Sequence, residues 1–374
     1  MINNVIIIII YVFIGSVFFR LPDRNTYKRK KQYVGIVSIL LILQSALRNL
    51  AVGDDTYGYY TAFIAANNKY TYSEVFSNFL NYYNGSIGSD FGYIFMEKFF
   101  SDILGGNFRI FLFLVAILFF ISLGKFILNN TRKLSDIVVA YTIYSALYFS
   151  FYSITGIRQT IAMAIVMFAI PYIKSKNIFK FLLLVFIAFT IHKSAIIFIL
   201  FYAVNRFKRL GKYLFLFALF LFPIAMSFKG QMLAVFQVII GSDSYSEYEG
   251  AGTLTFTLLF LLVSILTYWK RNFFIQNNIN SSFFFSALAL CLVLLPLSWI
   301  NPSLIRIIMY FSIYLLVVIP EILNSFSPIS VKLSKDLKIV SIILLVILYM
   351  KSNSEFQYGY FWDDMRLNKH YFQR

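Results

Sequence analysis

The first polar side chains that follow a hydrophobic run lie in residues 47–60. Arg48 stands at the end of the run, Asp54 and Asp55 follow Gly53, and Tyr60 closes the stretch. A chain needs no such group to cross a bilayer, because spanning requires only apolar side chains and satisfied backbone hydrogen bonds. We therefore expect this stretch to do chemistry, at the side of the membrane where the second hydrophobic segment ends.

Other cations are expected at helix ends on the same side of the membrane. Their positions are Arg109, Arg158 with its neighbour Gln159, His192 with its neighbour Lys193, and Arg306. Snorkelling to lipid headgroups explains any one of these arginines equally well. The set as a whole favours anion binding, because Arg158 and Arg306 lie within apolar sequence, where a charge needs a partner.

An arginine cluster without an acidic cage is suited to a diphosphate rather than to a metal ion. Guanidinium groups bind phosphate oxygens in pairs and can neutralise a departing diphosphate. We assign Arg158 and Arg306 to catalysis, and Arg48 and Arg109 to substrate binding, together with Gln159 and Lys193. No metal and no cofactor is expected.

The acid–base candidates are His192, Asp55, Asp54 and Asp90. Histidine has the most suitable unperturbed pKa for a general base, whereas a simple polar helix tip is the alternative. We assign His192 and Asp55 to catalysis and Asp54 and Asp90 to substrate binding. Turn formation equally explains the two adjacent aspartates. Several tyrosines, including Tyr60 and Tyr93, either stack on sugar rings or form an interfacial aromatic belt.

The elements that must position these residues are membrane helices. The 374 residues are 60% hydrophobic and 13% charged, with mean hydropathy +0.75, which is incompatible with a soluble domain of this size. The pattern predicts an all-α polytopic protein with about twelve crossings. The expected spans are 3–19, 34–50, 108–128, 136–152, 156–173, 178–190, 193–205, 213–228, 252–269, 283–299, 303–323 and 337–351.

Basic loops determine the expected orientation. The loops between alternate spans carry 21 of the 33 basic residues, and the whole net charge of +17 lies on their side. That side is predicted to be cytoplasmic, with both termini outside. The charge sets the topology and contacts anionic lipid; it does not indicate nucleic-acid binding.

The chain is expected to form a single domain, 1–374, with an outer loop at 51–107, a short outer loop at 229–251 and an outer tail at 352–374. Within the first loop, Thr71 and Glu74 fit a capping box, and a second amphipathic helix begins at Asp90 and ends at Gly105-Gly106. Both helices are predicted to lie in the membrane interface. A third short helix is expected over 231–240.

Taken in order, these residues resemble the EpsG family of Wzy-type polysaccharide polymerases. The stretches that carry the resemblance are Arg48 with Gly53-Asp-Asp-Thr56 and Tyr60, Asp90-x-Gly-Tyr93, Gly156-Ile-Arg-Gln-Thr-Ile-Ala162, Ile191-His-Lys-Ser-Ala195, Arg306 with Tyr310-Phe311, and, more faintly, Tyr358-Gly-Tyr360.

The resemblance implies a glycosyltransferase with a GT-C-like helical architecture in the bacterial cytoplasmic membrane. Such an enzyme transfers a growing glycan from undecaprenyl diphosphate to a lipid-linked repeat unit at the outer face, and a chain-length regulator is an open partner. An O-antigen ligase, a lipid-linked oligosaccharide flippase and an outer-face acyltransferase remain alternatives. A transporter should show charged or broken helices near the midplane and repeat symmetry, and neither is clear in this sequence.

Overall fold

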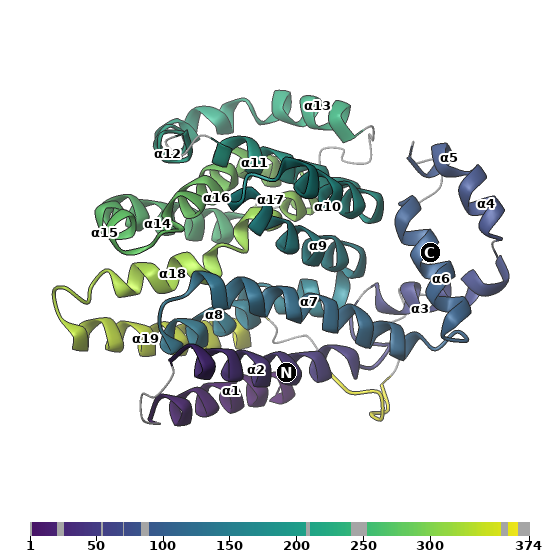
Figure 1. The fold of residues 1–374 in the computed structure, drawn as a ribbon, viewed down its shortest axis with the longest axis horizontal. Helices are drawn as coiled ribbons and strands as arrows, with labels where there is room; N and C mark the ends of the chain where they lie inside the picture. The colour runs from purple at the N-terminus through teal and green to yellow at the C-terminus, as the bar shows by residue number, and fades with distance from the viewer. Residues whose placement is uncertain are drawn as a thin grey trace.

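The computed structural model describes residues 2–20, 26–53, 55–69, 71–83, 90–206, 210–240, 253–352 and 358–365. Within these ranges the chain is all-helical, and its only β-type pairing is an isolated bridge between Arg48 and Tyr360. Most long helices run roughly parallel or antiparallel across the molecule in Figure 1, and the helices of the 51–107 loop gather at one end.

The first half of the chain supplies the outer-loop helices and the centre of the bundle. Its elements are α1 (Ile2–Arg20), α2 (Thr26–Ala46), α3 (Thr56–Lys69), α4 (Tyr72–Ser77), α5 (Phe79–Tyr83), α6 (Phe91–Ile103), α7 (Phe108–Asn130), α8 (Leu134–Leu147), the π-helix η1 (Phe149–Thr155), α9 (Ile157–Lys174) and α10 (Ile178–Ile191).

The second half completes the bundle with shorter and more often broken helices. Its elements are η2 (Lys193–Phe198), α11 (Ile199–Arg206), α12 (Leu210–Ser227), α13 (Lys229–Ile240), α14 (Leu254–Trp269), α15 (Arg271–Asn277), α16 (Ser281–Leu294), η3 (Leu295–Trp299), η4 (Pro302–Leu304), α17 (Ile305–Ser312), α18 (Leu315–Asn324) and α19 (Val331–Ser352).

The helices make this a membrane protein, although the number of crossings stays a prediction. Three helical segments of the described chain are long and apolar enough to cross a bilayer. The number of candidate spans rises to as many as seven if each bent pair of helices counts as one span. The three are Phe108–Asn130, Ile157–Lys174 and Ser281–Trp299, and two shorter apolar helices lie at Val5–Phe19 and Ile178–Ile191. Every expected span overlaps a helix of the described chain, but the twelve crossings are not confirmed.

Several expected spans are broken in ways that hydropathy does not reveal. The span expected at 136–152 is α8 followed by η1 at an angle of 65°, and the span at 303–323 contains a 58° bend between α17 and α18. Helices break where another element satisfies the backbone, and π-helical turns often mark functional sites. Here the hydroxyls of Tyr148 and Tyr152 donate to the carbonyl oxygens of Ser312 and Met309, so η1 is attached to α17.

The loop at 51–107 contains the expected helices, but the first of them is divided at Asn78 into α4 and α5, and one helix is additional. Thr71 and Glu74 form the expected capping box at the start of α4, and α6 runs from Phe91 to Ile103 before Gly105 and Gly106, both with positive φ. The helix predicted at 231–240 is confirmed as α13. We did not predict α3, which packs against α6 through a hydrogen bond from Ser101 Oγ to the Phe63 carbonyl oxygen.

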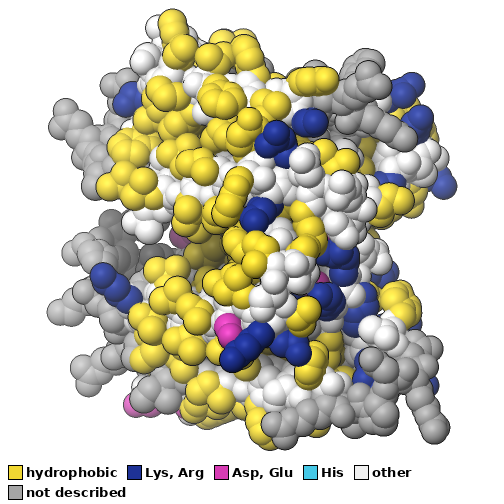
Figure 2. Space-filling model, turned by 90° about the vertical axis from the view of Figure 1, so that its left-hand side faces the viewer, with side chains coloured by type: hydrophobic (Ala, Val, Ile, Leu, Met, Phe, Trp, Pro, Cys, Tyr) yellow, Lys and Arg dark blue, Asp and Glu magenta, His cyan; other side chains and the backbone are white. Residues whose placement is uncertain are grey.

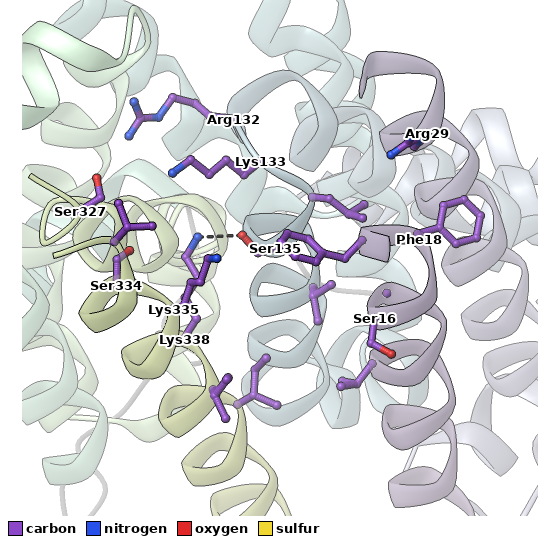
Figure 3. A pocket seen from close by; sticks show the side chains of 18 of the residues that line it. Ser16, Phe18, Arg29, Arg132, Lys133, Ser135, Ser327, Ser334, Lys335 and Lys338 are labelled. Atoms are coloured by element: carbon purple, nitrogen blue, oxygen red, sulfur yellow. Dashed lines mark hydrogen bonds between the residues drawn. The ribbon is translucent and has the colours of Figure 1, made fainter. Parts of the chain in front are cut away.

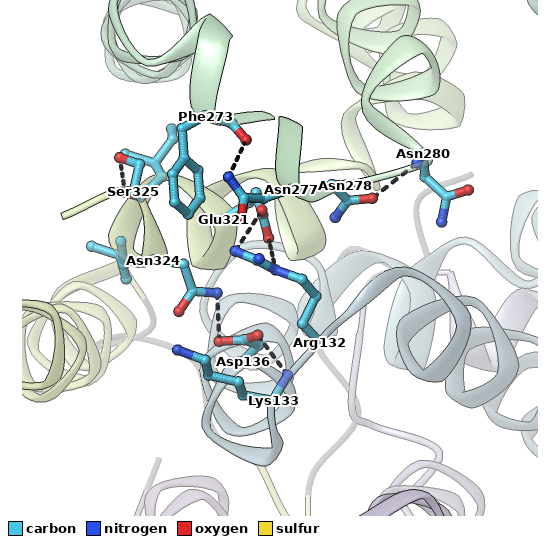
Figure 4. A network of polar contacts seen from close by, with 12 residues as sticks. Arg132, Lys133, Asp136, Phe273, Asn277, Asn278, Asn280, Glu321, Asn324 and Ser325 are labelled. Atoms are coloured by element: carbon cyan, nitrogen blue, oxygen red, sulfur yellow. Dashed lines mark hydrogen bonds and ion pairs between the residues drawn. The ribbon is translucent and has the colours of Figure 1, made fainter. Parts of the chain in front are cut away.

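The opposite end of the bundle carries the basic loops and a buried polar network. Figure 2 views this end, where Lys and Arg side chains far outnumber Asp and Glu. Arg132 pairs with Glu321 at 2.8 Å, and Lys338 pairs with Asp136 at 2.6 Å. The Asn324 amide also donates to Asp136 (Figure 4). These pairs join α8 to α18 and α19, and buried charges require such partners.

Candidate active site

The Asp90 carboxylate brings together a loop helix and two bundle helices. Its Oδ2 lies 3.5 Å from Arg158 Nη1 and 3.5 Å from His192 Nδ1. The side chains of Asp90, His192 and Arg158 are 10%, 14% and 27% exposed, so the contacts are largely shielded from water. Asp90 is the N-cap residue of α6, where the partial positive charge of the helix end favours a carboxylate.

Local structure fixes each of the three groups. The Asp90 side chain does not cap its own helix and is therefore directed to its two partners. Arg158 lies in the first turn of α9, immediately after η1 and Gly156. His192 occupies the junction between α10 and η2, where its backbone N–H donates to the Ala188 carbonyl oxygen.

Gly92 allows α6 to approach the end of α10. A Cβ at this position would lie 2.8 Å from the carbonyl carbon of Thr190 and 2.4 Å from its Oγ1. Backbone cannot rotate away as a side chain can, so any larger residue must separate the two helices. Since Thr190 is two residues from His192 and Gly92 is two from Asp90, this close packing sets the distance between the carboxylate and the imidazole.

Arg306, in the first turn of α17, adds a second guanidinium. Its charge acts electrostatically on His192, its side chain is exposed, and it lies over the Phe151 ring at 5.7 Å. It forms no salt bridge with any described residue. Gln159 ties its backbone in place, since Gln159 Nε2 donates to the Arg306 carbonyl oxygen at 2.5 Å. The Arg306 guanidinium is thus held near the Asp90 cluster without a carboxylate to neutralise it.

The tyrosine and glutamate next to the cluster form an aromatic and acidic wall. Arg158 lies 5.9 Å from the Tyr93 ring, and Tyr93 contacts Tyr59 edge-to-face at 5.8 Å. Burial raises the pKa of Glu97 to about 7, although the nearby Tyr93 hydroxyl and the Arg158 charge oppose the rise. Glu97 therefore changes protonation state near neutral pH beside an arginine.

The environment of His192 favours its neutral form. Burial lowers the pKa of His192, the positive charges of Arg158 and Arg306 lower it further, and Asp90 opposes both effects. Both ring nitrogens are buried without a hydrogen-bond partner among the described residues. A neutral imidazole can accept a proton, so His192, with Nδ1 3.5 Å from the Asp90 carboxylate, is a candidate general base.

Arg48 and Arg109 lie apart from this cluster, beside the C-terminal segment. Arg48 is 3% exposed, and its guanidinium donates to the carbonyl oxygens of Ser45 at 2.6 Å and Ile154 at 3.2 Å. Arg109 lies 3.9 Å from the Phe361 ring. The Tyr358 hydroxyl donates to the Gln44 carbonyl oxygen. Arg48 thus joins the end of α2 to η1, whereas Arg109 contacts the C-terminal segment directly.

The other expected site residues are more scattered. Asp55 precedes α3, and its side chain makes no recorded contact with a described residue, whereas Asp54 lies outside the described residues. Tyr60 packs edge-to-face on Phe108 at 5.7 Å. Lys193, next to His192, lines an apolar cavity.

This cavity lies between the loop helices and α10, directly beside Asp90. Its volume is about 250 Å³. Asp90 and Lys193 supply the charged groups of its wall. The rest of the lining is mostly aromatic and aliphatic and consists of Phe79, Leu80, Phe91, Phe186, Phe189 and Thr190. It offers room for an apolar chain next to a charged end.

Sequence analysis did not single out Glu97. Glu97 lies seven residues after Asp90 and four after Tyr93, on the buried face of α6. That helical spacing was a usable signal once Asp90 had been chosen. Among the described residues, no group of three or more His, Cys, Asp or Glu side chains can hold a metal ion.

The fold and the site define a polytopic membrane protein whose one end carries a largely buried Asp–His pair with one partly buried and one exposed arginine. The sequence pattern of the EpsG family matches residues 31–363. The chain therefore belongs to the EpsG family, a family of Wzy-type polysaccharide polymerases. No curated protein and no solved structure matches it.

The packing of Gly92 gives a test of the site geometry. We expect Gly92→Ala to force α6 away from Thr190 and to lower polymer formation roughly 10- to 100-fold, because small displacements of catalytic groups are costly. The measurement is polysaccharide yield in cells whose own copy of the gene is deleted, normalised to the amount of inserted protein.

Gly58→Ala is the matched control, since Gly58 lies in α3 with nothing within 4 Å of its added Cβ. It should leave polymer formation unchanged and stabilise α3 by up to about 1 kcal/mol. Equal activity of the Gly92→Ala and Gly58→Ala variants would show that the approach of α6 to α10 does not position the site.

Proposed function

We propose that this chain polymerises polysaccharide by transferring a growing glycan from undecaprenyl diphosphate to a lipid-linked repeat unit. The contact of Asp90 with Arg158 and His192 carries the proposal, because it assembles an acid–base pair and a phosphate-binding guanidinium at one point. Membership of the EpsG family supports the same reaction class. The reaction takes place at the outer face of the bacterial cytoplasmic membrane, in a GT-C-like bundle.

The chemical step follows from the positions of the groups. A hydroxyl at the non-reducing end of the acceptor gives its proton to His192 Nε2 and attacks the anomeric carbon of the donor glycan. The bond between that carbon and the diphosphate oxygen breaks, and undecaprenyl diphosphate leaves with the bonding electron pair. Asp90 orients the imidazole through Nδ1 and stabilises the imidazolium that forms.

Two guanidinium groups stabilise the leaving diphosphate. Arg306 has no carboxylate partner among the described residues and is exposed, so it is available to phosphate oxygens. Arg158 shares Asp90 and can strengthen its phosphate contact as negative charge develops. Guanidinium donors aimed at a developing charge in a shielded site lower the barrier rather than only improve binding.

The apolar cavity beside Asp90 and Lys193 suits the lipid of such a substrate. Its wall accepts the first part of a polyprenyl chain, while Lys193 and Arg158 lie at the end where the diphosphate begins. Tyr59 and Tyr93 offer aromatic faces and edges to a sugar beside Arg158.

Reconstitution gives the direct test. Purified protein in lipid, supplied with a synthetic repeat unit linked to undecaprenyl diphosphate, should produce a ladder of longer lipid-linked glycans without an added metal. A single product in which the glycan moves to a non-lipid-linked acceptor would identify a ligase. Absence of any transfer with the correct donor and acceptor would contradict the proposal.

The arginine assignment predicts that a positive charge at these two positions is not sufficient and that the paired donors of a guanidinium are required. Arg158→Lys and Arg306→Lys keep the charge but lose the paired donors, and each should lower the polymerisation rate on the order of 10- to 100-fold. Arg206→Lys is the control, because Arg206 is an exposed arginine at the other end of the bundle. Normal rates for both site variants would disprove the arginine clamp.

The base assignment predicts a pH profile. His192 must be neutral to accept a proton, and its pKa lies below the ordinary value of 6.5. The rate should therefore be maintained below pH 6.5 and fall only as the pH drops through the lowered pKa. His192→Ala should lower the rate on the order of a hundredfold and abolish this acidic limb. A variant close to wild type would transfer the base role to Asp55, Asp54 or Asp90.

A further inference from the structure

A cavity that has no part in the proposed reaction lies at the basic end of the bundle. Its volume is about 700 Å³, within the range typical of small-molecule sites. It is bounded by α1, the start of α2, the connection from α7 to α8, and α19. The Asp90 cluster belongs to the other end of these helices, so the two sites are separate.

The lining is positively charged, and none of the described residues that form it is acidic. Five cations reach it, from three different parts of the chain: Arg29, Arg132, Lys133, Lys335 and Lys338. Figure 3 shows Lys133, Lys335 and Lys338 on facing sides of one space, with serine hydroxyls between and beside them. A cavity with this charge selects an anion.

Two of these cations already have buried partners. Arg132 is paired with Glu321. Lys338 is paired with Asp136 and also donates to Ser135 Oγ at 2.9 Å and to the Asn324 amide oxygen at 2.9 Å. Their charges are balanced by the protein and serve the packing of α8, α18 and α19.

Lys133 and Lys335 are different. Neither side chain forms an ion pair with a described residue, and Lys335 only approaches the Phe19 ring at 5.9 Å. They extend from opposite walls, one from the start of α8 and one from the first turns of α19. An anion between them would neutralise two charges that the described residues leave unpaired.

Below the cations the wall is apolar. It is formed by side chains on the facing surfaces of α1, α8 and α19: Val12, Phe18, Val138, Ile339 and Ile342. Further along α19, Ile343 and Ile347 are more than half exposed, so an apolar surface continues from the cavity along the outside of the bundle. An apolar chain can follow this surface, whereas a soluble anion would occupy only the part of the cavity that the cations line.

We propose that this cavity is a binding site for an anionic phospholipid. The phosphate lies between Lys133 and Lys335, near Arg29, and an acyl chain lies against Phe18 and the α19 isoleucines. Basic pockets between membrane helices on the cytoplasmic side are suited to anionic headgroups. Charge complementarity and the adjoining apolar wall together favour a lipid over a free phosphate. The site is independent of the polymerase reaction.

The test compares lipids on the purified full-length protein. Protein is reconstituted in nanodiscs of phosphatidylcholine alone or of phosphatidylcholine with phosphatidylglycerol, and bound lipid is counted by native mass spectrometry after release. We expect retained phosphatidylglycerol and a higher unfolding temperature in the mixed discs. Each surface cation contributes about 1 kcal/mol to such binding, so the double variant Lys133→Gln/Lys335→Gln should retain phosphatidylglycerol roughly 30-fold less well.

Lys332→Gln is the matched control, because Lys332 lies on the same turn of α19 and does not line the cavity. It should behave as wild type. If the double variant is not monodisperse, phosphatidylglycerol retention is compared between Lys332→Gln and the single variants Lys133→Gln and Lys335→Gln. Equal retention by the cavity variants and Lys332→Gln would overturn the proposal. A stabilising effect of inorganic phosphate equal to that of the lipid would identify a soluble-anion site and would overturn it as well.

Discussion

The contact of one carboxylate with two cationic or basic side chains determines how the outer loop sits on the bundle. Asp90 belongs to the loop helix α6, whereas Arg158 and His192 belong to α9 and the end of α10. Removing a carboxylate from such a setting would leave Arg158 partly buried without compensation, which is far more costly than losing a surface pair. The helix end at α6 further favours the negative charge. The loop must therefore be folded for the cluster to exist.

That requirement explains the packing within the loop. Ser101 fixes α6 to α3 through the Phe63 carbonyl oxygen, and Lys98 Nζ donates to the Asn67 carbonyl oxygen at 2.8 Å. On the bundle side, η1 is attached to α17 by the hydroxyls of Tyr148 and Tyr152, immediately before the turn that carries Arg158. Arg158 and Arg306 are thus supported by one shared unit, and Gln159 links them again through the Arg306 backbone.

Periodicity and hydropathy were enough to predict the helices and the capping box at Thr71, because these depend on local sequence. They could not predict the breaks, since the π-helix at 149–155 depends on hydrogen bonds to residues about 160 positions away. The helix at 56–69 was missed because its tyrosines and small residues show no clear apolar face. Arg158, His192, Arg306 and Asp90 were all singled out from helix ends and motif order, but the sequence could not reveal that Asp90 joins two of them.

The five arginine and histidine positions chosen on the outer side separate by what each one faces. A helix-end arginine that donates to backbone carbonyl oxygens, as Arg48 does through Nη1 and Nη2, has part of its guanidinium engaged by the protein. Arg109 lies over the Phe361 ring and so contacts the C-terminal segment. Arg306 has a ring beneath it and no described carboxylate, and Arg158 shares its carboxylate with His192. Sequence position separates these cations only by their depth in apolar sequence, and it does not reveal which groups each one contacts. The partners that a guanidinium already has limit its freedom to turn to a new anion. We therefore propose Arg158, which shares its carboxylate, and Arg306, which has no carboxylate among the described residues, as the two groups that bind the diphosphate.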